Sequence, residues 1–500
     1  MPLASTAEAG ASVANAVLRD LRLARGWSQA DVARRLNALA DERSEHGSLS
    51  EGTVGRWERG EVRMPEPLHR QLLAELFGVS LEELGYFEPS QPGPRDVGER
   101  ERPPLALAAP RVDHHVEQSQ QDWRAARRHL NGQRVALTIS ASRLYEPELR
   151  LGSTGTLARS DWRPPAPVDL ASVSLEWVDQ PAAAAVNGQE EQTAAVRPLT
   201  GAGRRFARYT HALRAVDPPA LFENRVSYRL LDVAWTASGG RLKFGPTTYF
   251  ENVDVNEAVA HELAAAQLAN HEPLAWRRLP FRRLIDNPFD LARRPLLPSI
   301  DTLTLRRDRS GGASMVLHQR DPARVAVAGG MFHVMPAGVF QPASIHPTLQ
   351  HDDFDLWRSM MREYSEEFLG NPDHDGTGPP VRYDLDEPFV SLDRARRDGL
   401  LRAWCFGVGL DALTLNGEIL TAVVFDAEVF DDVFADLVER NSEGAVVAAV
   451  DDAGRTRGLP FTEHQIHQLL GSGTLAPAAA ACLQLAWAHR DVLLDASTTA

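Results

Sequence analysis

Apolar residues recur at the spacing of amphipathic helices through the first part of the chain, residues 1–88. A first helix ends at a glycine, and Ser28 then stands where a second helix would be capped. Ser50 is placed to cap a third helix, whose inner face carries Val54 and Trp57 three residues apart. A leucine-rich helix and a last short helix follow. The pattern therefore predicts a small all-α domain.

Beyond residue 88 the pattern changes twice. Residues 89–115 are rich in proline, glycine and charge and lack periodicity, which predicts a flexible linker. After it we expect a connecting helix and a mixed α/β region at 116–299, then an α/β domain with C-terminal helices at 300–500. A chain of 500 residues is too long to fold around a single hydrophobic core, so we expect a multidomain protein. Strands are expected at 173–177, 228–233, 303–305, 315–319, 332–335 and 420–425, and helices at 117–145, 256–268 and 354–369. Two more helices are expected within 464–494, the second of them at 478–494.

The third helix offers polar and basic groups on the side away from its apolar stripe. By spacing, Arg56 and Arg59 point outward, together with Glu51, Thr53 and Gly55. A helix with short or basic outward side chains suits the major groove of DNA. An ordinary amphipathic surface helix has the same pattern, so these residues alone leave both interpretations open.

Three segments occur together around this helix: GWSQADVARRL before it, TVGRWERG within it and FGVSLEEL after a proline-led helix. In this order they resemble the phage-repressor and Cro type of helix-turn-helix, the XRE family, over roughly residues 13–87. The resemblance implies binding of double-stranded DNA, with the third helix as recognition helix. The chain departs from the family at 37–49, where the turn before the recognition helix is longer.

The resemblance also implies a set of DNA-contacting residues on and before the recognition helix. Of these, Arg56 has the side chain best suited to guanine O6 and N7. Arg22 and Glu58 match a buried ion pair of the family. The positions that match phosphate contacts are Gln29, Ser50 and Arg59, and those that match base contacts are Glu51, Gly52 and Arg56, with Thr53 beside them.

Charge limits how the chain can bind DNA. The formal net charge is −15, and the first 88 residues also hold more acidic than basic groups. This balance argues against sequence-independent coating of nucleic acid. Because a single copy should bind weakly, we expect a homodimer on paired half-sites. Local arginines must supply the attraction, namely Arg34, Arg35, Arg56, Arg59 and Arg63.

Composition and cysteine usage are those of an ordinary globular protein. Hydrophobic residues make up 43% and charged residues 24% of the chain. The two cysteines, Cys405 and Cys482, lie in apolar surroundings and are expected to be buried thiols. No signal peptide opens the sequence and no apolar run reaches membrane-spanning length. We therefore expect a cytoplasmic protein without a membrane partner.

A second group of candidate residues lies in the segment REYSEE. Glu363, Glu366 and Glu367 stand at i, i+3 and i+4, which places them on one face of an α-helix. Three such carboxylates repel one another unless a hard cation such as Mg²⁺ neutralises them, and that cation can hold a diphosphate. Arg362 is expected to orient the cluster. The alternative is a solvated acidic helix end, with the apolar residues between the glutamates facing the core.

REYSEE and the order of strands, loop and helix around it resemble the Nudix family, whose box reads G-x5-E-x7-R-E-U-x-E-E-x-G-U. The resemblance implies an α/β/α sandwich, Mg²⁺ as a candidate cofactor, and a nucleotide-like ligand. The match is incomplete, since Phe354 stands at the upstream glutamate, Thr348 at the first glycine, and Gly370 comes one residue late. We expect at most weak Mg²⁺ binding and little or no hydrolysis, and we assign no catalytic residue.

Three functions stay open at this point. The first is a transcription regulator whose C-terminal region senses a nucleotide or nucleotide-sugar. The second is an active Mg²⁺-dependent Nudix hydrolase with a DNA-targeting module. The third is a regulator whose C-terminal region serves only as a dimerisation or protein-interaction platform.

Overall fold

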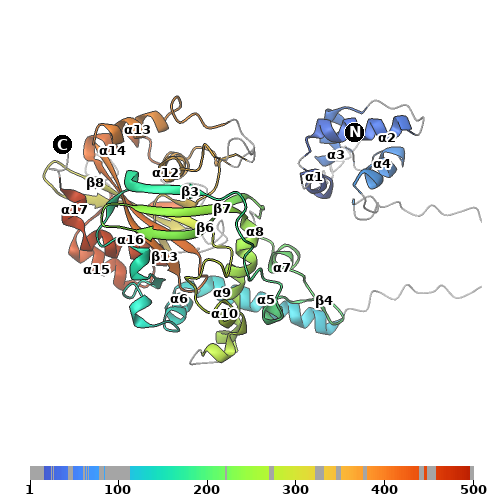
Figure 1. The fold of residues 1–500 in the computed structure, drawn as a ribbon, viewed down its shortest axis with the longest axis horizontal. Helices are drawn as coiled ribbons and strands as arrows, with labels where there is room; N and C mark the ends of the chain where they lie inside the picture. Colours follow the sequence, from blue (N-terminus) through green and yellow to red (C-terminus); the bar gives the residue numbers. More distant parts are fainter. Residues whose placement is uncertain are drawn as a thin grey trace, which may run out of the picture. The chain divides into compact units, whose positions relative to one another are not determined.

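The structure is a computed structural model in which the chain forms two compact units, an N-terminal unit (1–108) and a C-terminal unit (109–500). Figure 1 shows the elements of each. The residues that it describes are 16–23, 25, 27–42, 49–59, 62, 65, 67–77, 84, 113–219, 222–269, 275–320, 331–344, 351–374, 380–438, 444–447 and 458–495.

The N-terminal unit is helical, as the apolar spacing predicts. Its core joins the four helices formed by the described residues, with Leu18, Val32, Val54, Trp57 and Leu72 buried together. One stripe per helix supplies these contacts, which is the arrangement expected of amphipathic helices around a single core. The helices are α1 (Ala16–Leu23), α2 (Gln29–Glu42), α3 (Glu51–Glu58) and α4 (Pro67–Phe77).

The longer segment before α3 begins as helix. Helix α2 continues to Glu42, so residues 37–42 extend it, while 43–48 lie outside the described residues. The Asn37 side chain joins the two ends of this longer segment. Its Nδ2 donates to the Leu49 carbonyl at 2.9 Å, and its Oδ1 accepts from the Leu49 N–H at 2.8 Å. These two bonds fix the chain directly before the cap of α3.

The C-terminal unit is built on a curled eight-stranded sheet with the path β1-β13-β14-β8-β9-β16, to which β12 adds beside β8 and β2 beside β13. Strands β8 and β14 run parallel, and the other pairs are antiparallel. The strands are β1 (Thr156–Leu157), β2 (Val168–Asp169), β8 (Pro298–Arg307), β9 (Ala313–Met315), β12 (Ala337–Val339), β13 (Leu401–Asp411), β14 (Gly417–Asp426) and β16 (Leu459–Pro460).

Helices cover this sheet on both faces (Figure 1). Helix α16 (Pro477–Ala488) packs on β8, β13 and β14, accompanied by α15 (Glu463–Gly471) and α17 (Arg490–Leu494). On the other face lie α12 (Leu356–Glu363), α13 (Phe389–Arg397) and α14 (Ala427–Val433). The predicted helix 478–494 is interrupted at His489, which separates α16 from α17.

The remaining elements complete the C-terminal unit. Smaller sheets are β3-β7-β6 (Val173–Trp177, Gly240–Thr248, Val226–Trp235), β11-β10-β15 (Phe332–Val334, Leu317–Arg320, Gly444–Val447) and β4-β5 (Leu199–Gly201, Arg204–Arg205). Further α-helices are α5 (His114–Gly132), α6 (Arg134–Ser142), α7 (Tyr209–Val216), α8 (Tyr249–Asn252), α9 (Ala258–Leu268) and α10 (Pro280–Ile285). The 3₁₀ turns are Pro147–Leu149, Ser160–Trp162, Leu170–Ser172, Glu191–Val196 and Trp276–Arg278, and the π-helical turns are Val253–Glu257 and Tyr364–Phe368.

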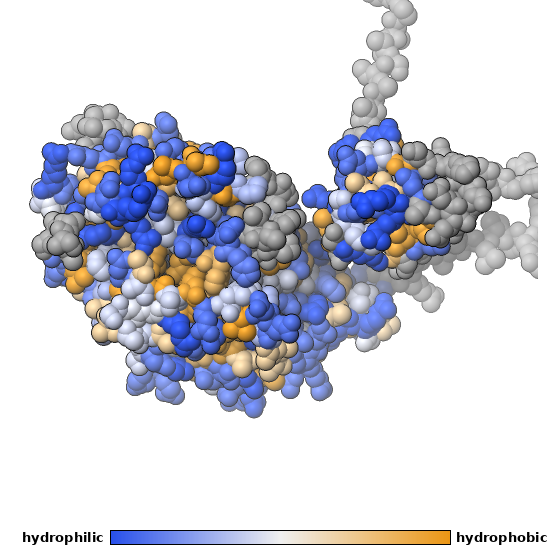
Figure 2. Space-filling view, turned by 45° about the horizontal axis from the view of Figure 1, so that its top comes forward, coloured by the Kyte–Doolittle hydropathy of each residue, from blue (hydrophilic) through white to orange (hydrophobic). Residues whose placement is uncertain are grey.

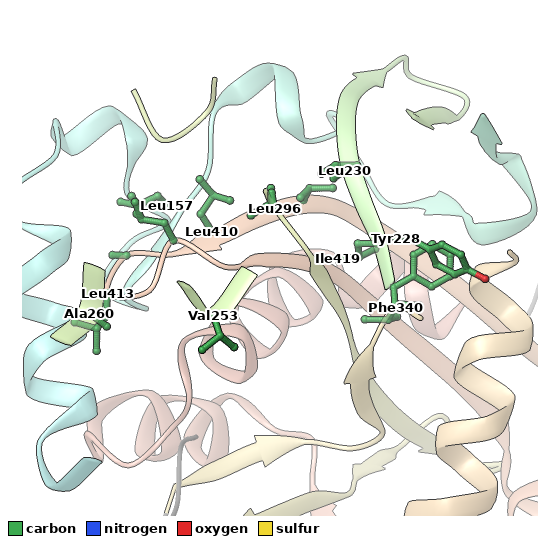
Figure 3. Packing of buried hydrophobic residues seen from close by; sticks show 14 of the residues in the cluster. Leu157, Tyr228, Leu230, Val253, Ala260, Leu296, Phe340, Leu410, Leu413 and Ile419 are labelled. Atoms are coloured by element: carbon green, nitrogen blue, oxygen red, sulfur yellow. The ribbon is translucent and has the colours of Figure 1, made fainter. Parts of the chain in front are cut away.

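The predicted boundary at residue 299 is wrong, because one core crosses it. Figure 3 shows Leu157 and Tyr228, from before the boundary, packed in the same cluster as Phe340, Leu410 and Ile419, from after it. Strands β1 and β2 also pair with β13. The segments before and after residue 299 share this core, so they belong to one compact unit.

Three further predicted elements differ from the observed ones. The predicted helix 117–145 is two helices, because α5 ends at Gly132. The predicted strand 315–319 divides between β9 and β10, which belong to different sheets. The predicted helix 354–369 begins at Leu356 and ends in a π-helical turn.

Within the described residues no helix is long and apolar enough to cross a membrane. Hydrophilic side chains cover much of the face in Figure 2.

Candidate nucleic-acid interface

Helix α3 is fixed at both ends by its own sequence. Ser50 Oγ accepts a hydrogen bond from the Thr53 N–H at 3.3 Å, which satisfies one of the free donors at the helix start. Arg59 forms the C-cap, with its backbone N–H bonded to the Gly55 carbonyl. Val54 and Trp57 of this helix are buried in the core of the domain. The exposed residues are Ser50, Glu51, Gly52, Arg56 and Arg59, and Thr53 is half-buried.

The spacing predicts that Gly55 faces outward, but the structure places it inward. It is buried against α2, and a Cβ at this position would lie 2.9 Å from Gln29 Oε1. The absence of a side chain allows the start of α2 to approach α3 closely. Gly55 is therefore a packing position and offers nothing to a ligand.

Gln29 also has a partner that the sequence did not indicate. Its Nε2 donates to Glu58 Oε2 at 2.7 Å, and the side chain is half-buried between α2 and α3. The amide is thus held inside the domain, at a position for which the family resemblance implies a phosphate contact.

The expected ion pair between Arg22 and Glu58 is confirmed. Arg22 Nε donates to Glu58 Oε1 at 2.7 Å and Nη2 donates to Oε2 at 3.0 Å, a two-bond contact of the strongest kind for a carboxylate. The side chains are 11% and 4% exposed. Arg22 Nη1 also donates to the Trp27 carbonyl. Helix α1 is therefore tied to the end of α3 and to the segment before α2.

The arginines near α3 are not equally available to a ligand. Arg34 pairs with Asp31 at 2.7 Å, and the Arg35 guanidinium lies 4.3 Å from the centre of the Trp27 ring. Arg56 is exposed and makes no ion pair with any described residue. Arg63 lies outside the described residues. Arg56 is thus the free cation at the centre of the exposed face of α3.

Comparison with known families fits this arrangement. Residues 18–84 match the family model described as helix-turn-helix. These residues form a helix-turn-helix domain. In that domain α2 and α3 are the two helices of the motif, and α3 is the helix that enters the major groove in such domains. Comparison with curated proteins gave no match.

The three glutamates of the C-terminal unit have separate partners. Glu363 lies against Gly338 in β12, Glu367 Oε1 accepts from the Ala337 N–H at 3.1 Å, and Glu366 Oε1 lies 2.7 Å from His374 Nδ1. Glu363 and Glu367 thus face residues 337–338 of β12, whereas Glu366 contacts His374. The π-helical turn Tyr364–Phe368 explains this, because its wider i→i+5 geometry moves side chains out of the α-helical alignment.

Arg362 does not orient the glutamates. Its Nη1 lies 3.2 Å from Asp353 Oδ1 and 2.6 Å from the Tyr383 hydroxyl, which itself donates to Asp353 Oδ1 at 2.6 Å. This buried group joins the segment before α12 to the segment before α13. Within the described ranges, no three His, Cys, Asp or Glu side chains lie together so as to hold a metal ion. The predicted Mg²⁺ ligands Glu363, Glu366 and Glu367 are thus not brought together.

Proposed function

We propose that the protein is a sequence-specific transcription regulator that binds double-stranded DNA through α3. The observation that carries this proposal is the division of α3 into two sides. Val54, Trp57 and Glu58 lock one side into the domain, while Arg56 stands exposed on the other. A rigid helix that presents a free arginine and a small Gly52 can approach base edges closely.

We further propose that it acts as a homodimer. The net charge of −15 gives no general attraction to DNA, and among the described arginines near α3 two are already engaged by Asp31 and Trp27. One recognition helix therefore offers few phosphate contacts, and two half-sites bound together would supply the missing affinity. The oligomeric state in solution, measured by light scattering with and without DNA, tests this part.

For the C-terminal unit we propose a sensing or dimerisation role with a Nudix-like layout. The helices on both faces of a mixed sheet and the segment REYSEE support this layout. We do not extend the proposal to hydrolysis, because the three carboxylates that it would need have different partners. An assay of ADP-ribose, NADH and nucleotide-sugars with Mg²⁺ or Mn²⁺ tests whether the protein hydrolyses them. Turnover that is abolished by Glu366→Gln would contradict our proposal that it does not.

Arg56→Ala should weaken specific binding by about 1–3 kcal/mol without loss of folding, because one bidentate base contact is removed from an exposed side chain. A genomic map of bound sites supplies the operator, and titration of that operator by fluorescence anisotropy measures the change. Discrimination between the operator and a sequence altered at one base pair should also fall.

The matched control is Arg19→Ala, which removes an exposed arginine from α1 and should leave both affinity and discrimination nearly unchanged. Equal operator affinity of the Arg56→Ala variant and the wild type would remove Arg56 from the base-reading residues. Equal weakening by the two variants would indicate a general charge effect.

A further inference from the structure

A cleft of about 340 Å³ lies in the C-terminal unit beside the end of α16. One wall is the segment after the 3₁₀ turn Ser160–Trp162, which contributes Arg163 and the neighbouring prolines. Leu485 of α16, His489 at its C-cap and Phe406 of β13 also line the cleft. A volume of this size lies at the small end of ligand sites.

Arg163 is the unusual residue of this cleft. It is half-buried and makes no ion pair or hydrogen bond with any residue in the described part of the chain, and its Nε is buried without a partner. Among the described residues of the unit, Arg306 pairs with Asp431 at 2.6 Å, and the buried Arg229 donates from Nη1 to the Ala182 carbonyl at 3.0 Å, so these guanidinium groups have partners that Arg163 lacks. Burial lowers the pKa of Arg163, which is the sign of a cation without compensation.

No described acidic residue forms an ion pair with Arg163, although Asp161 lies beside a second hollow that Arg163 also lines. No acidic side chain lines the 340 Å³ cleft, and the second group near Arg163 is another base, His489. Burial, and then the charge of Arg163, lower the pKa of His489. The nearest acidic residue in sequence, Asp161, is engaged by Arg159, whose Nε donates to it at 2.7 Å.

The backbone of β13 packs closely against the segment that carries Arg163. Strand β13 has a bulge between Cys405 and Gly407, where Gly407 adopts φ 108°. A Cβ at Gly407 would lie 2.6 Å from the Trp162 carbonyl oxygen and 2.7 Å from Arg163 Cα. This conformation and this close approach both require glycine, so the bulge fixes the segment that carries Arg163.

The other walls are apolar. Pro164, Pro165, Pro167, Phe406 and Leu485 are among the lining residues, together with the neutral polar residue Ser160. A guanidinium pairs with carboxylate or phosphate oxygens through two parallel hydrogen bonds. Proline and aromatic walls favour a ligand with an apolar body over a bare inorganic ion.

We propose that this cleft binds a small organic anion, whose carboxylate or phosphate group pairs with Arg163 and whose apolar body lies against Phe406, Leu485 and the prolines. The site lies wholly within the C-terminal unit. It is independent of the proposed DNA binding, and a test in the absence of DNA separates the two.

Isothermal titration calorimetry on the full chain, with benzoate and phenyl phosphate as probes, tests the proposal. Benzamide is the neutral control for benzoate. Inorganic phosphate is the control for phenyl phosphate that lacks an apolar body. At least one of the organic anions should bind with a Kd of about 1 mM or tighter, and benzamide and inorganic phosphate should bind at least about tenfold more weakly. Comparison of benzoate with phenyl phosphate tells a carboxylate site from a phosphate site.

Arg163→Met should weaken binding of the preferred anion by about tenfold or more, because the charge-assisted bonds are lost while the apolar stem remains. Its unfolding temperature should be no lower than that of the wild type, since no ion pair is broken. The control Arg204→Gln removes an exposed arginine of β5 that does not line the cleft, and its binding should match the wild type.

Three results would overturn the proposal. They are no saturable binding of either organic anion, binding unchanged in Arg163→Met, and binding of benzamide as tight as that of benzoate. If Arg163→Met does not fold, Arg163→Lys provides the test, since it keeps the charge and loses the two-bond geometry, and the proposal then requires weaker binding of the preferred anion.

Discussion

Glu58→Ala should unfold or nearly unfold the helix-turn-helix domain. Glu58 accepts two bonds from Arg22 and one from Gln29, at 2.7–3.0 Å. Its removal leaves the Arg22 charge buried without a partner, at a cost of about 3–5 kcal/mol. A domain of the size of residues 18–84 has a free energy of unfolding of roughly 3–10 kcal/mol, so the loss is a large fraction of the total. Hydrogen–deuterium exchange of the full chain should show lost protection in α2 and α3.

The chain provides a matched control for this prediction. Arg34 and Asp31 form a pair of the same length, 2.7 Å, but their side chains are 76% and 32% exposed. Arg34→Ala should cost less than about 1 kcal/mol, since water solvates the remaining carboxylate. The double variant Arg22→Met, Glu58→Leu should be more stable than Glu58→Ala, because neither charge is left buried. Equal exchange rates in Glu58→Ala and Arg34→Ala would contradict the role given to the buried pair.

The C-terminal unit should lose stability in mild acid because of His261. This residue is 1% exposed, its Nδ1 lies 3.1 Å from the Tyr209 hydroxyl, and its ring stacks on Trp123 with centres 5.0 Å apart. Burial, and then the charge of Arg127, lower the pKa of His261 from 6.5 to about 3. The folded state thus keeps the ring neutral where the unfolded state takes up a proton.

The direction of the pH effect follows from the lowered pKa. The contribution of His261 is fully present above pH 6.5 and falls as the pH decreases towards 3. The slope is about 1.4 kcal/mol per pH unit, or about 3 kcal/mol by about pH 4.5. Urea unfolding of the full chain, followed by circular dichroism between pH 7.5 and about 4.5, measures it. In the His261→Gln variant, the free energy of unfolding should fall by this amount less between pH 7.5 and about 4.5. This holds even if the variant differs from the wild type in stability at pH 7.5.

His115→Gln is the control for His261, because His115 is exposed on α5. Its pH dependence of unfolding should equal that of the wild type. If His261→Gln shows the same slope as His115→Gln, the ring of His261 is protonated in the folded state and the prediction is wrong.

The sequence by itself determined the helical domain and, apart from Gly55, the side of α3 that faces outward. Apolar spacing and the Ser50 cap act within a few residues, so they can be read without knowledge of the fold. The separation of Arg56 from Val54 and Trp57 follows from helical geometry alone. The pair of Arg22 and Glu58, by contrast, was reached through the family resemblance, since no local pattern joins residues so far apart.

Tertiary structure decided what depends on distant partners. The amide of Gln29 turned inward because Glu58 accepts its hydrogen bond, and Gly55 is buried because α2 crosses it closely. In the C-terminal unit, the expected boundary at residue 299 disappeared because β1 and β2 pair with β13, and the aligned glutamates separated where α12 passes into a π-helical turn. Arg163 looks like any other arginine in the sequence. Only the fold shows a half-buried cation beside a cleft without acidic walls, because burial and the position of carboxylates are properties of the packed chain.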